Sequence, residues 1–155
     1  MATEKWIGGS GQGLTWGNAF SAATLNSIAS GNAILSDIVI ANGTPLDIFA
    51  DLSLNLASAA FVAPNFVGVY LYPLNDGSAY GDGRFGTSAA GPPPSTYSVG
   101  SIGLVAATQA QTGQLLRIVL PPGSFKFVLY NQGGVAWAGA AGNTCLYRTY
   151  NRSVA

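Results

Sequence analysis

The chain has 155 residues and a mass of 15.8 kDa, the length of one domain with a sizeable hydrophobic core. Only 8% of the residues are charged, six bases balance six acids, and histidine is absent. These numbers argue against nucleic acid as the main partner and remove the usual groups of acid–base and metal chemistry, so a structural or binding protein is the expected class.

Residues 1–17 are predicted to form a flexible N-terminal arm. No apolar core of a signal peptide is visible there, and segment 6–17 is rich in glycine. Trp6 and Trp16 have little local core to enter, so we expect them to be buried on a neighbouring molecule. The candidate partner-binding residues are Trp6, Ile7, Leu14, Trp16 and Phe20.

Residues 18–30 can form a short helix. Phe20, Leu25 and Ile28 give a partial apolar stripe, Asn18 can cap the first turn, and Gly31 can terminate the last one.

From residue 33 onward the pattern changes to that of strands. Asn42-Gly43 is a strong hairpin signal between an expected strand over 34–40 and the next one over 46–57. In that second strand aliphatic residues alternate with mostly polar ones, which places them on opposite faces. Further strands are expected over 66–74, 97–107, 115–120, 124–131 and 144–152.

About seven or eight short antiparallel strands are therefore expected, separated by glycine- and proline-rich turns. No stretch after residue 32 has a helical period, so an all-β sandwich or jelly roll is predicted, with 18–155 as a single domain. Such folds have edge strands, and this chain has few charges to guard them. Pairing with another subunit is an alternative way of protecting those edges.

Charge is distributed unevenly along the chain. Residues 1–82 carry all six acids and one base, Lys5, whereas residues 83–155 carry five bases and no acid. One interpretation is electrostatic complementarity between neighbouring copies or with a partner. The preferred one is that strands from both halves interleave and average the field, because asymmetry along a sequence does not fix asymmetry of a surface.

The few chemically active residues do not form a recognisable catalytic set. Cys145 has no histidine to pair with and lies in an alternating strand, so it is expected to be a small buried hydrophobic residue. Asp47 and Asp51 would lie on one face of a strand about 13 Å apart, which exceeds the carboxylate spacing of glycosidases. A solvated strand face is the expected environment of this pair.

A loop with Asp76 and Asp82 is the one candidate for cation binding. Its oxygen-rich composition suits calcium, but the acid spacing and the late glutamate of an EF-hand are missing. Asp-Gly is also a common way to make a turn, and this is the preferred explanation. Neither a cofactor nor a metal site is assigned, and whether this loop binds a cation stays open.

Three segments together resemble a family of small virion proteins of tailed bacteriophages. They read TLNSIASGN at 24–32, LPPGSFKFVLYN at 120–131 and GNTCLYRTYN at 142–151, and the resemblance covers roughly 18–153. It implies a capsid decoration or cement protein with a β-sandwich or jelly-roll body. Such a protein would be made in the host cytoplasm and would bind the outside of the shell as a dimer or trimer, over junctions of the major capsid protein.

A binding module and an enzyme are the two alternatives to a decoration protein. A tail or fibre-associated module that binds a receptor or glycan would have a similar sequence, with tyrosine and tryptophan of loops 75–97 and 132–143, including Trp137, as stacking platforms. An enzyme such as a lysin-type hydrolase is not expected, because no acid–base pair is apparent. No stretch is apolar and long enough for a membrane span, so no membrane partner is expected.

Overall fold

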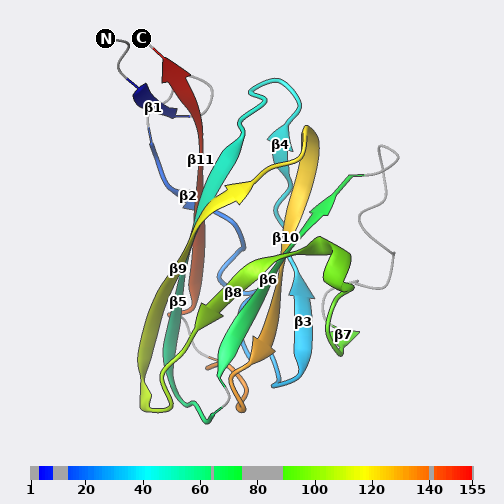
Figure 1. Ribbon diagram of the computed structural model, residues 1–155. Coiled ribbons are helices and arrows are strands. Elements are labelled where there is room, and N and C mark those ends of the chain that lie inside the picture. The colour runs from blue at the N-terminus through cyan, green and yellow to red at the C-terminus, as the bar shows by residue number, and fades with distance from the viewer. Residues whose placement is uncertain (1–3, 9–13, 64, 75–88, 140–141, 155) are drawn as a thin grey trace.

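The computed structural model describes residues 4–8, 14–63, 65–74, 89–139 and 142–154, which form a sandwich of two antiparallel sheets (Figure 1). Sheet A has the order β1-β11-β5-β9, with β2 also paired to β11, and sheet B has the order β7-β3-β10-β6-β8, with β4 also paired to β10. Sheet A consists of β1 (Glu4–Gly8), β2 (Gly17–Asn18), β5 (Phe49–Ala60), β9 (Thr108–Val119) and β11 (Thr144–Val154). Sheet B consists of β3 (Asn32–Leu35), β4 (Ile40–Asn42), β6 (Phe66–Pro73), β7 (Ala89–Ala90), β8 (Ser98–Gly103) and β10 (Gly123–Gln132), and a short 3-10 turn, η2 (Ser95–Tyr97), precedes β8.

The prediction of an all-β sandwich is confirmed. The described residues contain eleven strands instead of seven or eight, because strands of two residues such as β2 and β7 carry no alternation that a sequence pattern could reveal. The long strands β6, β10 and β11 lie within two residues of their predicted bounds.

The core lies between the sheets and follows the period of two. On β10, Phe125, Phe127 and Leu129 are fully buried and point to the same side, toward the aliphatic residues of β5. The β5 residues that face them are Ala50, Leu52, Leu54 and Leu56. Burial of each large side chain contributes roughly 1.5–3 kcal/mol, so this interior holds the two sheets together.

The helix predicted over 18–30 is wrong, although its apolar stripe is buried as expected. The segment makes only short turns, with Thr24 N–H donating to Ser21 O at 3.2 Å, and Ser27 has a left-handed φ of 58°. Phe20, Leu25 and Ile28 are buried in the core. The Ser21 N–H donates to the Asp37 side-chain Oδ1 at 3.0 Å, and such side-chain bonds to the backbone compete with a helix.

The hairpin predicted at Asn42-Gly43 is a turn that connects the two sheets. The preceding strand β4 pairs with β10 in sheet B, whereas the following strand β5 belongs to sheet A. The Asn42 side chain is buried and holds the turn: its Oδ1 accepts the Asp47 N–H at 2.7 Å, and its Nδ2 donates to Asp47 O and Pro121 O. A side chain thus replaces the cross-strand pairing that a hairpin would have.

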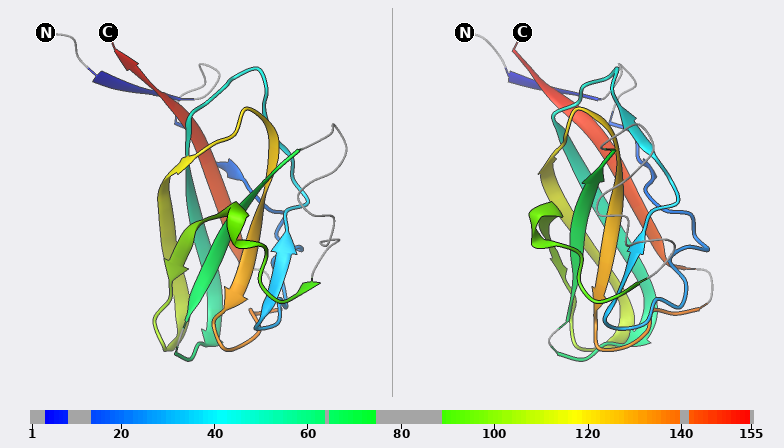
Figure 2. Two further views of the ribbon diagram at one scale, coloured as in Figure 1. Left: turned by 45° about the vertical axis from the view of Figure 1, so that its right-hand side comes forward. Right: turned by 90° about the vertical axis from the view of Figure 1, so that its right-hand side faces the viewer.

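The two ends of the chain form a two-stranded ribbon. Residues Thr144–Tyr150 of β11 pair with β5, but Tyr150–Val154 pair with Gly8–Glu4 of β1. This terminal ribbon, residues 4–8 and 150–154, extends beyond the sandwich, as both views of Figure 2 show. Residues 4–8 of the predicted arm are therefore a strand, while residues 1–3 and 9–13 lie outside the described part of the chain.

Candidate functional site

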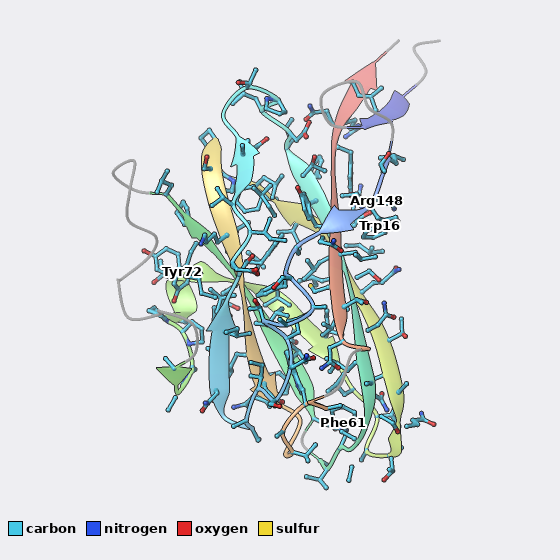
Figure 3. The ribbon with its side chains drawn as sticks, turned by 180° about the vertical axis from the view of Figure 1, so that it is seen from behind. Trp16, Phe61, Tyr72 and Arg148 are labelled. Carbon is cyan, nitrogen blue, oxygen red and sulfur yellow. The ribbon has the colours of Figure 1, made fainter. Side chains whose placement is uncertain are left out.

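The outer face of sheet B is covered by the protein itself. Tyr72, Val128 and Tyr130 form a second apolar cluster there, and all three are buried. Tyr97 of η2 packs on Tyr72 with ring centroids 4.6 Å apart. This face is therefore part of the body of the protein, and Figure 3 shows Tyr72 on the side of the molecule away from Trp16 and Arg148.

The outer face of sheet A exposes large apolar side chains. A cross-strand row runs from Val119 through Phe49 to Tyr150, and the last two rings stack with centroids 5.8 Å apart. Val119 is 67% exposed and Leu116, on the same strand, is 55% exposed. Contiguous apolar patches mark interaction sites, whereas exposed hydrophobic residues that are scattered singly are normal on a protein surface.

A carboxylate lies at the centre of this face. Asp51 of β5 is only 4% exposed and accepts four hydrogen bonds, two on each oxygen. Its Oδ1 accepts the Arg117 N–H at 3.0 Å and the Tyr150 hydroxyl at 2.9 Å. Its Oδ2 accepts Arg148 Nε–H at 2.9 Å and Nη2–H at 2.8 Å. Because a carboxylate has about four lone-pair sites, Asp51 is saturated.

These contacts set the charges of the cluster. Burial alone raises the pKa of Asp51, but the hydrogen bonds from Arg117 N–H, Arg148 and Tyr150, together with the charge of Arg148, outweigh it and lower that pKa. Burial and the neighbouring Asp51 carboxylate raise the pKa of Tyr150. At neutral pH the pair is therefore an ionised carboxylate and a protonated phenol, which makes the Tyr150 hydroxyl a hydrogen-bond donor to Asp51.

Arg117 is held by an irregularity of strand β9. The pairing of β9 with β5 shifts register between Ala50 and Leu52, opposite Leu116 and Arg117. Arg117 has a left-handed φ of 60°, which costs a non-glycine residue on the order of 1–3 kcal/mol. A bulge of this kind re-aims side chains, and here it also directs the Arg117 N–H at Asp51.

Arg148 is fixed from a second side by an aromatic ring. Its guanidinium carbon lies 4.7 Å from the centre of the Trp16 ring, a cation–π contact. Strand β2, which follows Trp16 directly, pairs with β11 through Gly17 and Tyr147 and so places the ring. Figure 3 shows Trp16 and Arg148 next to each other at this side of sheet A.

These groups line a surface pocket of about 220 Å³, which we call the arginine pocket. Its walls consist of Asp51, the three residues that donate hydrogen bonds to it, and two exposed leucines. The lining residues are Leu14, Asp51, Leu116, Arg117, Arg148 and Tyr150. The arrangement is suited to binding through charge and apolar contact, because its one carboxylate is already saturated.

The predicted partner-binding residues are distributed over three environments. Ile7 is 42% exposed on the terminal ribbon, where the backbone of Trp6 pairs with that of Arg152. Leu14 lines the arginine pocket and Trp16 packs on Arg148, so these two lie at one site. The expectation for Phe20 needs correction.

Phe20 is 2% exposed and belongs to the core. The chain turns inward at Ala19, whose N–H donates to Cys145 O of β11, and this contact directs the following residue into the sandwich. Phe20 therefore contributes to the body and is not available to a partner.

The expected solvated face of Asp47 and Asp51 is also wrong, because each is 4% exposed. Asp47 precedes β5 and accepts a hydrogen bond from Asn151 Nδ2 at 2.9 Å, whereas Asp51 forms the ion pair with Arg148. Sequence analysis missed the roles of Asp51, Arg117 and Arg148. One sequence signal does point to them. Asp51 and Arg117 are the single charged residues of β5 and β9, and Arg148 is the single charged residue in the part of β11 that pairs with β5.

Two of the remaining candidate residues, Cys145 and Trp137, lie in the core. Cys145 is buried, as predicted, and burial raises the pKa of its thiol. Trp137 is 2% exposed within the core cluster, which overturns its expected role as a glycan-stacking platform. The loop with Asp76 and Asp82 lies outside the described residues.

No protein-family model matches the chain, and no curated protein matches it significantly. Within the described residues, no three His, Cys, Asp or Glu side chains are grouped as a metal site would require. In the same residues, none of the helical structure is long and apolar enough to cross a membrane.

Proposed function

We propose that the protein is a non-enzymatic virion structural protein, a decoration protein that binds the outer surface of a major capsid protein shell and stabilises it. The observation that carries this proposal is the difference between the two outer faces of the sandwich. Sheet B is covered by the chain itself, whereas sheet A exposes Leu116 and Val119, and Leu116 lines the arginine pocket together with the exposed Leu14. The resemblance of three segments to small phage virion proteins supplies the partner.

The chemistry of the described side chains supports a binding role over catalysis. Asp51 has its lone pairs taken up by four hydrogen bonds, and Cys145 is buried with a raised pKa, so neither is poised as a nucleophile or base. The strained backbone at Arg117 serves to hold this cluster. A rigid body with one prepared surface is what a cementing protein needs.

Low charge and repetition on a lattice fit the same role. With six bases and six acids in 155 residues, neighbouring copies on a shell would repel each other little. Many copies bound to one lattice also gain from multivalency, so each contact can be modest. Among the described strands, β1 pairs with β11 alone, so the terminal ribbon offers a strand edge through which a copy could associate with itself as a dimer or trimer.

The first test is the copy number of this chain in purified phage particles, measured by quantitative mass spectrometry against the most abundant shell protein. A ratio near one, or a simple fraction of one, is expected for a lattice-bound decoration protein. A ratio of a few per cent would overturn the capsid role in favour of a tail or fibre position. Absence from every particle would overturn both virion positions.

The second test identifies the binding face on shells that lack the protein. Val119→Asp places a charge at the β9 end of the cross-strand row, where Val119 is 67% exposed, and is expected to reduce binding at least tenfold, since a charge buried unpaired in an interface is costly. Val105→Asp is the matched control, because Val105 is 60% exposed in the loop between β8 and β9, away from the lining of the arginine pocket. Equal binding of the two variants would remove sheet A from the interface.

A further inference from the structure

We propose that the outer edge of β9 pairs with the same edge of a second copy of the chain, antiparallel and about a two-fold axis. This edge is distinct from the terminal ribbon. Among the described strands, β9 pairs with β5 alone and stands at the end of the strand order of sheet A. Figure 1 shows β9 along the left edge of the sandwich.

The length of β9 is the first argument. This strand has twelve residues, whereas β1, β2, β4, β7 and β8, the other strands at the edges of the two sheets, have between two and six. Very short edge strands are one of the ways in which proteins prevent edge-to-edge pairing. The β9 edge does not have this protection, and it is long enough to pair with a strand of typical length.

The regularity of β9 is the second argument, because a bulge would turn an edge away from a partner strand. The pairing of β9 with β5 shifts register twice. The first shift, between Ala50 and Leu52, adds a residue to β9 beyond residue 115. The second shift, between Leu56 and Ala59, adds a residue to β5 instead. Segment 108–115 of β9 therefore runs without a bulge of its own.

The side chains of this segment suit an identical strand as the partner. Residues 108–115 include no charged residue and no proline, the two residue classes that commonly guard an edge. A charged edge would meet its own charge across a two-fold axis and be repelled. The exposed polar residues here carry hydroxyl or amide groups, which both donate and accept hydrogen bonds, so two copies of them are complementary. They are Thr108, Gln109, Thr112 and Gln114.

The geometry of such a dimer determines where its faces lie. Antiparallel neighbours in a sheet are related by a two-fold axis perpendicular to the sheet, so the A sheets of the two copies would join into one continuous sheet. Both outer faces of sheet A would then lie on the same side, each with its exposed Leu116 and Val119. On a shell, two such faces would bind together and gain from multivalency. This last consequence rests on the proposed function, whereas the dimer itself does not.

The test is the mass of the full-length protein in solution, measured by sedimentation equilibrium over a dilution series. A concentration-dependent dimer, of twice the chain mass of 15.8 kDa, is expected. The double variant Ala110→Lys/Gln114→Lys changes two exposed positions of β9 and places like charges across the paired edges. It is expected to weaken the dimer on the order of tenfold, and added salt is expected to restore part of the loss.

Charge rescue separates an effect on pairing from an effect on folding. The double variant Ala110→Glu/Gln114→Glu is expected to weaken the dimer as much as the lysine variant does. An equimolar mixture of the two variants is expected to associate again, because opposite charges then face each other across the two edges. A variant that had lost its fold would not be restored by mixing.

The matched controls place a lysine at exposed positions of other edges. They are Ser101→Lys on β8 and Ile7→Lys on the terminal ribbon, and both are expected to leave the dimer unchanged. The proposal is overturned if the unmodified protein is monomeric at every concentration, which would leave the β9 edge to a strand of a different chain. It is also overturned if the mixture of charged variants does not associate, or if a control weakens the dimer while the β9 variants do not.

The dimer and the proposed function fail in distinguishable ways, because the mass is measured without shells. A β9 dimer of a protein that is absent from every particle would leave this interface standing and overturn the decoration role. Conversely, decoration of shells by a protein that is monomeric in solution would leave the decoration role standing and overturn the β9 dimer.

Discussion

The two outer faces of the sandwich differ in how far the chain covers them. Each sheet buries one face in the common core, and each has a second face that must be covered or solvated. In sheet B that face carries Tyr72 and Val128, and the chain returns over it through Tyr97 of η2. In sheet A it carries Val119 and Leu116, which remain more than half exposed.

The outer face of sheet A also carries a network of polar side chains. Sheet A holds an ion pair between Asp51 and Arg148 with four directed hydrogen bonds at the carboxylate. A buried ion pair is weak evidence for stability, because an apolar replacement is often as stable. The outer face of sheet A thus combines this ion pair with the exposed Leu116 and Val119, whereas the outer face of sheet B is apolar and covered by the chain.

The largest expected effect is the difference in stability between valine-to-aspartate variants of the two faces. Val128→Asp places a charge at a fully buried position of sheet B and is expected to lower the free energy of unfolding by about 4 kcal/mol or more. Val119→Asp, at 67% exposure, is expected to change it by no more than about 0.5 kcal/mol. Urea unfolding of both variants measures the difference, and equal losses would show that the face of sheet A is not exposed in solution.

Removal of the central carboxylate is expected to have the next largest effect. Asp51→Asn leaves Arg148 without its counter-charge and is expected to lower the free energy of unfolding by about 2–3 kcal/mol, less than for a fully buried pair because the Arg148 side chain is 29% exposed. Asp37→Asn is the control, since Asp37 is exposed and should change stability by less than about 1 kcal/mol. Similar losses in the two variants would contradict a special role for the Asp51 cluster.

Acid titration isolates the ionised form of the same group. The pKa of Asp51 is lowered by folding, so its contribution to stability is present above the unfolded value of about 3.9 and is lost as pH falls through the folded value. Stability should therefore decline below about pH 4, and this decline should be shallower in Asp51→Asn. Urea midpoints from pH 2 to 7 measure both slopes, and identical slopes would show that the carboxylate is not stabilised by its partners.

The smallest expected effect is at the ring that covers Arg148. Trp16→Leu keeps an apolar side chain but removes the cation–π contact at 4.7 Å, so a loss of about 0.5–1 kcal/mol is expected. Ile7→Ala on the terminal ribbon is the companion substitution and should change stability less, because Ile7 is 42% exposed. A Trp16→Leu variant as stable as the unmodified protein would mean that the ring does not hold Arg148 in solution.

Alternation along the chain determined the strands and their inner face. The aliphatic residues of β5, the phenylalanines of β10 and the buried Cys145 all follow from a period of two, because neighbouring residues of a strand point to opposite sides whatever lies opposite. The apolar stripe of Phe20, Leu25 and Ile28 was equally visible. Its spacing predicts a helix that the structure does not contain, since three apolar positions do not distinguish a helical turn from a series of short turns.

Tertiary structure alone decided which outer face is covered and which charges meet. Asp51 and Arg148 are 97 residues apart along the chain, and only the antiparallel register of β5 and β11 makes them partners. Trp137 lies in a loop rich in small residues and is buried, and its backbone N–H donates to the carbonyl oxygen of Ile28 in a distant segment. A sequence pattern reports which residues share a face, but the environment of that face is set by chain segments that the local pattern does not contain.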